Sequence, residues 1–105
     1  MTKEKIYEKA KKDHRKAYIA IEARLDEDLV SAIDDLVVLS VNMNLSLEEL
    51  LSGKYDPQIE TIIEVVFKGR GNTCKSGLDC WNVLRQVEKK YITAAYNFVV
   101  AGRNL

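Results

Sequence analysis

The first 45 residues contain neither glycine nor proline, and this absence constrains the fold more than any other feature of the chain. Steps of about 3.6 residues from Tyr7 meet one apolar or aromatic position after another without a change of phase, which is the pattern of one helix face. These positions lie at or near Ala10, His14, Tyr18, Ile21, Leu25, Leu29, Ala32, Leu36, Leu39 and Met43.

The one candidate break in this segment is LDED, from Leu25 to Asp28, where Asp26 could cap a new helix. Without a break, residues 3–43 would form one helix of about 60 Å. A compact chain of this length has a radius of gyration of about 13 Å, so its remaining residues could not cover such a helix. We therefore favour a long helix that self-associates over the alternative, a compact four- or five-helix monomer with a turn at LDED.

Two shorter helices are expected after residue 45. Ser46, followed three residues later by Glu49, is a capped helix start, and Gly53 is a stop signal. Asp56 and Pro57 are a second start signal, and an apolar face follows at helical spacing until the glycines of GRG end the helix.

A longer C-terminal helix is expected from Gly77 to Ala101. Ser76, with Asp79 three residues later, caps its start, and Gly102 ends it. We therefore predict an all-α fold, a small antiparallel helical bundle with a long or kinked N-terminal helix, in a single domain of residues 1–105. The apolar face of the C-terminal helix consists of Cys80, Leu84, Val87, Tyr91, Ala94 and Phe98.

The net charge is zero, but the charges are unevenly distributed along the chain. Residues 1–24 carry eight basic and four acidic side chains, residues 25–66 one and ten, and residues 67–105 seven and two. Packing of the ends beside the middle, within one chain or between copies, would compensate these charges. Because no apolar run approaches the length of a membrane span and the N-terminus lacks the apolar core of a signal peptide, we expect a soluble, cytoplasmic protein.

The stretch FKGRGNTCKSGLDCW holds three of the five glycines and both cysteines. Glycines on both sides of Arg70 permit backbone amides to converge, and the next helix presents its N-terminal amides nearby, so a phosphate or carboxylate could bind there. The candidate ligand-binding residues are Lys68, Arg70, Lys75 and Ser76. The stretch lacks the spacing of a Walker motif and follows a helix, so we favour an ordinary helix–helix connection over an anion site.

The cysteines and the single histidine do not form a metal-site pattern. Cys74 and Cys80 are six residues apart, which is not the CxxC spacing, and only His14 could join them. We expect free thiols, with Cys80 in the core and Cys74 open to modification beside basic residues. His14 falls on the apolar phase without a catalytic partner, so we interpret it as a packing residue. No metal and no cofactor is expected.

Acidic residues on the second quarter of the chain suggest an enzymatic alternative. Glu27 and Asp34, or Asp28 and Asp35, are seven apart and share a helical face that could hold Mg²⁺. The stretch DDLVVLSVNMNLSLEELL resembles the later part of the core of the all-α nucleotide pyrophosphatases. That resemblance implies a paired-glutamate ExxE helix upstream, where this chain has Glu22 alone. A solvated acidic face is the simpler interpretation.

The first helix also carries a basic stripe of Lys5, Lys9, Lys12 and Lys16. Phosphate backbones are bound by such charge, but acidic residues are interleaved at ion-pairing distance and no DNA-reading motif accompanies the stripe. We therefore expect a solvated face with ion pairs, and neither nucleic acid nor a membrane as partner.

No catalytic constellation is visible, so binding is favoured over enzymatic activity. We predict a small adaptor, inhibitor or regulatory protein that presents helical faces and forms a homodimer or higher oligomer, with itself or another protein as partner. The first alternative is a binder of a phosphate-bearing ligand or nucleotide at the basic glycine-rich loop. The second is a Mg-dependent nucleotide hydrolase on the acidic face.

Overall fold

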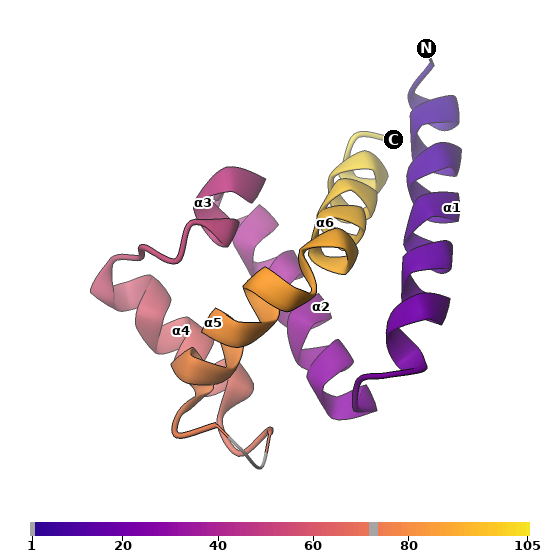
Figure 1. The fold of residues 1–105 in the computed structure, drawn as a ribbon. Helices are drawn as coiled ribbons and strands as arrows, with labels where there is room; N and C mark the ends of the chain where they lie inside the picture. Colours follow the sequence, from indigo (N-terminus) through magenta and orange to yellow (C-terminus); the bar gives the residue numbers. More distant parts are fainter. Residues whose placement is uncertain (1, 72–73) are drawn as a thin grey trace.

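The computed structural model describes residues 2–71 and 74–105 and contains six α-helices and no strand within them (Figure 1). The Cα radius of gyration is 13.6 Å, and the molecule extends 44 × 31 × 17 Å. The prediction of an all-α helical bundle is therefore confirmed. The helices are α1 (Lys3–Glu22), α2 (Glu27–Asn42), α3 (Leu47–Leu51), α4 (Pro57–Phe67), α5 (Gly77–Val87) and α6 (Lys89–Arg103).

The N-terminal segment is bent, so the prediction of one unbroken helix over residues 3–43 is wrong. The chain turns between α1 and α2, and the turn at LDED is the alternative that the structure adopts (Figure 1). Asp26 leaves the helical conformation at φ −57° and ψ 138°, and its carboxylate accepts the amide of Asp28 at 2.8 Å. Because α1 folds back to pack chiefly against α6, the argument for self-association from an uncovered helix of 60 Å no longer applies.

The C-terminal helix is interrupted as well. A single helix from Gly77 to Ala101 was expected, but α5 ends at Val87 and α6 begins at Lys89, with Glu88 between them at φ −108° and ψ 30°. The change of direction turns Val87 out of the predicted apolar face, and its side chain is 66% exposed. Gly102 does not end the helix either, since α6 continues to Arg103.

An ion pair joins the two interruptions. The Nη2 atom of Arg24, in the α1–α2 turn, lies 2.5 Å from Oε1 of Glu88, and Nη1 of Arg24 donates to the carbonyl of Ala20 at 2.7 Å. Glu88 is 3% exposed. Each break therefore supplies one partner of a charged hydrogen bond that two continuous helices would not form.

The local start signals behave as predicted. Ser46 and Glu49 form a reciprocal capping box at α3, Asp56 caps α4 with Pro57 in its first turn, and Ser76 caps α5 by accepting the amide of Asp79. These contacts satisfy amides that a helix leaves without an internal partner.

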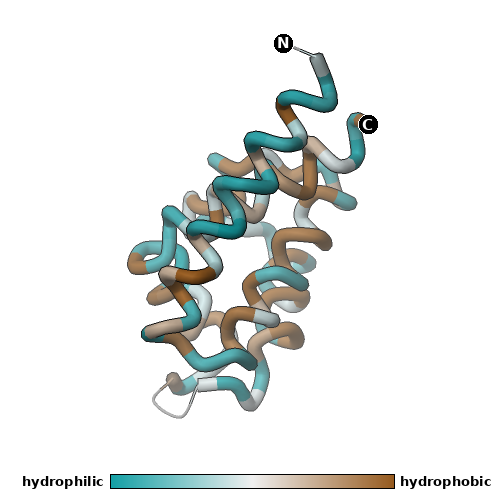
Figure 2. Tube along the Cα trace, turned by 90° about the vertical axis from the view of Figure 1, so that its right-hand side faces the viewer, coloured by the Kyte–Doolittle hydropathy of each residue, from teal (hydrophilic) through white to brown (hydrophobic). Residues whose placement is uncertain are grey.

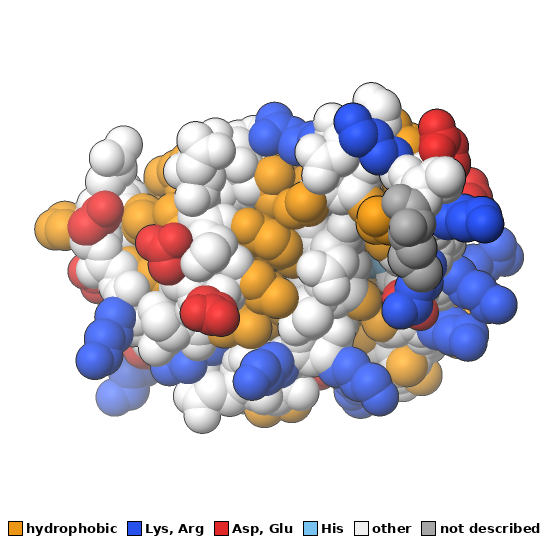
Figure 3. Space-filling view, turned by 90° about the horizontal axis from the view of Figure 1, so that it is seen from above, with side chains coloured by type: hydrophobic (Ala, Val, Ile, Leu, Met, Phe, Trp, Pro, Cys, Tyr) orange, Lys and Arg blue, Asp and Glu red, His pale blue; other side chains and the backbone are white. Residues whose placement is uncertain are grey.

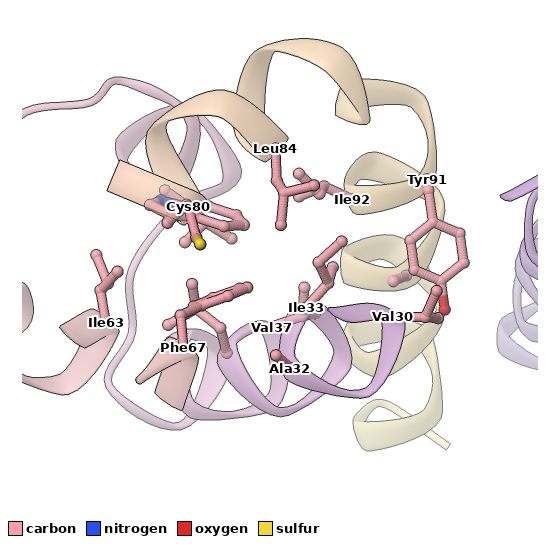
Figure 4. Close-up of a cluster of buried hydrophobic side chains, with 14 of the residues drawn as sticks. Val30, Ala32, Ile33, Val37, Ile63, Phe67, Cys80, Leu84, Tyr91 and Ile92 are labelled. Carbon is pink, nitrogen blue, oxygen red and sulfur yellow. The ribbon is translucent and has the colours of Figure 1, made fainter. Parts of the chain in front are cut away.

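The core lies between α2, α4, α5 and α6 (Figure 4). Phe67 of α4 and Trp81 of α5 are fully buried with ring centroids 5.7 Å apart, and the indole nitrogen of Trp81 donates to the hydroxyl of Tyr55 at 2.8 Å. α4 and α5 approach so closely that a Cβ on Gly77 would lie 2.5 Å from the carbonyl oxygen of Glu64. Glycine is therefore required at this position by the close backbone approach.

Charge is divided between the two sides of the molecule. α1 carries seven basic and four acidic side chains and α6 three basic and none acidic, whereas α2, α3 and α4 together carry eight acidic and no basic ones. The outward face of α1 is largely hydrophilic (Figure 2). From above, Lys and Arg side chains gather toward α1, several acidic side chains lie toward α3, and a hydrophobic band runs between them (Figure 3). The two basic ends of the chain thus lie side by side.

Candidate functional site

An extended depression of the surface runs along the contact between α1 and α6, and we call it the α1–α6 groove. It consists of three adjoining hollows that all include Asp13, the largest of about 580 Å³. The helices are antiparallel, so Ile6 and Asn104 line one end and Ala20 and Lys90 the other. From Ile6 to Ala20 the groove follows about 21 Å of helix.

The base of the α1–α6 groove is formed by small side chains and its edges are basic. Ala10, Ala17, Ala20 and Ala94 line it. Lys9, Lys16, Lys89 and Lys90, all exposed, contribute positive charge along it, and Asp13 is the acidic residue among the lining residues. Small residues allow close approach of another backbone, and the lysines favour a segment with acidic side chains.

A hydrogen-bonded chain of three side chains joins α1, α6 and α2. The hydroxyl of Tyr91 donates to Oδ1 of Asp34 at 2.6 Å, and Nε2 of His14 lies 3.3 Å from the same hydroxyl. His14 also stacks on Phe98 with ring centroids 4.9 Å apart.

The environment of this chain changes its acid–base properties. Burial raises the pKa of Asp34, although the Tyr91 hydrogen bond and the nearby His14 act in the opposite direction. Burial, followed by the contact with Asp34, raises the pKa of Tyr91. Sequence reasoning placed Asp34 on a solvated acidic face and did not connect it with Tyr91, because the two residues are 57 positions apart.

At the predicted anion site, the start of α5 binds a carboxylate of the chain itself, that of Glu64. The amide of Leu78 donates to Oε2 of Glu64 at 2.7 Å. The hydrogen bonds from Leu78 and Gly77 lower the pKa of Glu64, as expected for a carboxylate at a helix N-terminus. An acidic residue on the preceding helix was the available signal in the sequence, but its position relative to α5 depends on packing.

The predicted ligand-binding residues are dispersed around this start. Ser76 caps α5, and Nη1 of Arg70 donates to the carbonyl of Asp28 at 3.0 Å. Lys68 and Lys75 are exposed. Asn72 and Thr73, which also belong to the glycine-rich stretch, lie outside the described residues. Binding of a phosphate-bearing ligand there stays a prediction.

The remaining predicted residues divide between core and surface. Cys80 is buried and its thiol donates to the carbonyl of Arg70 at 3.0 Å, whereas Cys74 is partly exposed. Within the described ranges, no group of three or more His, Cys, Asp or Glu side chains could hold a metal ion. Of the proposed Mg²⁺ face, Glu27, Asp28 and Asp35 are exposed, while Asp34 is engaged with Tyr91.

The basic stripe of α1 is exposed, as predicted. The ion pairs expected along this stripe do not form. In the described part of the chain, the ion pair closer than 4.0 Å is that of Arg24 with Glu88. The positive charge on the edge of the α1–α6 groove is therefore not neutralised by close contacts within α1.

None of the helices described is both long and apolar enough to cross a lipid bilayer. Comparisons of the chain with models of protein families, with curated proteins and with solved structures found no match.

Proposed function

We propose that this protein is a non-enzymatic binding protein that acts through the α1–α6 groove, and that an acidic helical segment of a second copy occupies it. The observation that carries the proposal is the groove itself, with its small-residue base and basic edges. A homo-oligomer results, and a partner protein with a similar acidic helix would compete for the same groove, as in an adaptor or inhibitor.

The dimensions of the groove support a helical occupant. Its length of about 21 Å corresponds to about 14 residues, or four turns, of a docked helix. Alanines at the base allow two helix axes to approach toward the short end of the usual 8–10 Å range. Val87 is 66% and Ile6 46% exposed, so apolar surface is available near each end.

The charge distribution supports a second copy as the occupant. α2 and α3 carry exposed acidic side chains, and from above several acidic side chains lie toward α3 (Figure 3). Contact between unlike faces is head to tail, so the assembly either closes into a ring or continues to grow with concentration. Exposed ion pairs contribute about 0.2–1 kcal/mol each and weaken with salt, which predicts a salt-sensitive assembly.

Sedimentation velocity over a concentration series tests this proposal. At low salt we expect the mean mass to rise above the 12.0 kDa of one chain as concentration increases, and to fall back in about 0.5 M salt. Ala94→Glu places a larger, negatively charged side chain at the base of the groove and should abolish the increase. The matched control is Val83→Glu on α5, where the replaced side chain is 55% exposed and does not line the groove.

Two results would reject the proposal. One is a constant mass of one chain up to millimolar concentration at low salt. The other is an assembly that Ala94→Glu leaves intact but that Val83→Glu disrupts, because the contact would then lie on α5 and not in the groove.

A further inference from the structure

Cys74 and Cys80 come together around one point of the backbone. A Cβ built on Gly71 would lie 2.9 Å from Sγ of Cys80 and 3.6 Å from Sγ of Cys74. The two sulfur atoms therefore flank the same small volume, which is free because residue 71 has no side chain. Gly71 has a φ of 89°, a conformation that also favours glycine.

We propose that Cys74 and Cys80 form a reversible intramolecular disulfide, with a peroxide or a low-molecular-weight disulfide as the oxidant. The geometry differs from that of a CxxC motif, since the two cysteines are six positions apart in the sequence and both sulfurs lie beside Gly71. Both cysteines are free thiols in the structure, and Cys74 is close enough to contribute to the raised pKa of Cys80.

The two thiols have different roles in the reaction. Cys74 is partly exposed and precedes Lys75, so it can meet the oxidant and is the residue that reacts first. Cys80 is 2% exposed, and burial, together with the neighbouring Cys74, raises its pKa to about 12. It therefore stays protonated until the second step.

With a peroxide the reaction balances in two steps. The Cys74 thiolate attacks one peroxide oxygen, the O–O bond breaks, and a sulfenic acid forms as hydroxide leaves and takes up a proton to become water. The Cys80 sulfur then attacks the sulfenic sulfur, the S–S bond forms, and the hydroxide leaves with the thiol proton as a second water. Two thiols lose two electrons and two protons, and the peroxide is reduced to two waters.

Oxidation changes a contact between two parts of the fold. The thiol of Cys80 donates to the carbonyl of Arg70 at 3.0 Å, and this hydrogen bond is lost when the disulfide forms. The guanidinium of Arg70 donates to the carbonyl of Asp28 at the start of α2. The disulfide thus removes a contact of Arg70, a residue whose side chain reaches the start of α2.

Peptide mapping under non-reducing conditions tests the proposal. Trypsin cleaves after Arg70, Lys75 and Arg85, which separates GNTCK from SGLDCWNVLR. After treatment of the folded protein with hydrogen peroxide and blocking of the remaining thiols, we expect these two peptides to be joined, the intact chain to lose two hydrogen atoms, and dithiothreitol to reverse both changes. In Cys80→Ala, a sulfenic acid on Cys74 should be trapped by dimedone, whereas Cys74→Ser should give neither product.

The rate of disulfide formation is compared between the folded and the unfolded protein. This comparison shows whether the fold, and not a flexible chain, brings the two cysteines together. We expect the disulfide to form at least about tenfold faster in the native protein than in 6 M guanidinium, because folding holds the two sulfurs together. Equal rates, or links between different chains in place of the internal one, would overturn the proposal.

Discussion

Arg24→Ala should destabilise the fold more than a typical surface substitution, because it removes the cation beside a buried carboxylate. Glu88 is 3% exposed, and its Oε1 lies 2.5 Å from Nη2 of Arg24. The side chain of Arg24 is 53% exposed, so the pair lies at the edge of the core and not at its centre.

The exposure of Arg24 determines the magnitude. Loss of one partner from a fully buried pair costs about 3–5 kcal/mol, and loss of a hydrogen bond to a charged group about 1.5–3 kcal/mol. Because water can replace part of the half-exposed guanidinium, we expect the lower range, a decrease of about 1.5–3 kcal/mol in the free energy of unfolding. For a domain of this size that lowers Tm by about 6–20 °C.

Urea unfolding followed by the fluorescence of Trp81, which is the single tryptophan and fully buried, measures the change. Arg15→Ala, on the exposed surface of α1, is the matched control and should change stability by no more than about 0.5 kcal/mol. A double-mutant cycle with Glu88→Gln should give a coupling of at least about 1 kcal/mol. Additive effects, or an Arg24→Ala protein as stable as the control, would refute the reasoning.

Three further substitutions are tested by the same unfolding assay. Gly77→Ala should destabilise the protein by about 1–3 kcal/mol, because the new Cβ would lie 2.5 Å from the carbonyl oxygen of Glu64. Gly102 lies inside α6, and a Cβ there would lie 3.6 Å from the nearest side chain, so Gly102→Ala should instead stabilise the protein by about 0.5–1 kcal/mol. A change of stability in the same direction for both glycine substitutions would contradict this account. Burial raises the pKa of Asp34 above its ordinary 3.8, so the stability that this group contributes is present below that value and lost as pH rises through the folded pKa. Asp34→Asn should therefore gain stability relative to wild type between about pH 3 and pH 7, and a falling difference would show that the Tyr91 hydrogen bond to the carboxylate dominates.

Helix starts were predictable from the sequence because they depend on neighbours. Ser46, Asp56 and Ser76 cap the helices that were expected to follow them, and each cap is a contact between residues three positions apart. The all-α class follows from the same local signals together with the helical spacing of apolar residues. These preferences act within one turn of helix and require no knowledge of the fold.

Helix interruptions were not predictable in the same way. The apolar phase runs through LDED and through Glu88 without a break, so periodicity favoured continuous helices at both places. The structure ends the helices there, and Arg24 and Glu88 form their contact across 64 positions of sequence. The predicted stripe has helical spacing, but α5 ends at Val87 and the chain changes direction at Glu88, so the Val87 side chain is exposed.

The candidate sites show the same division. The sequence identified the basic residues of α1, the capped start of α5 and the two cysteines, because these depend on residue types and short spacings. Packing alone brings α6 beside α1 to form the α1–α6 groove, places Glu64 at the amides of α5, and leaves the space at Gly71 that both sulfurs border. Chemical character is a property of each residue and its neighbours in the chain, whereas these arrangements arise from contacts that form only when distant helices bury their apolar faces together.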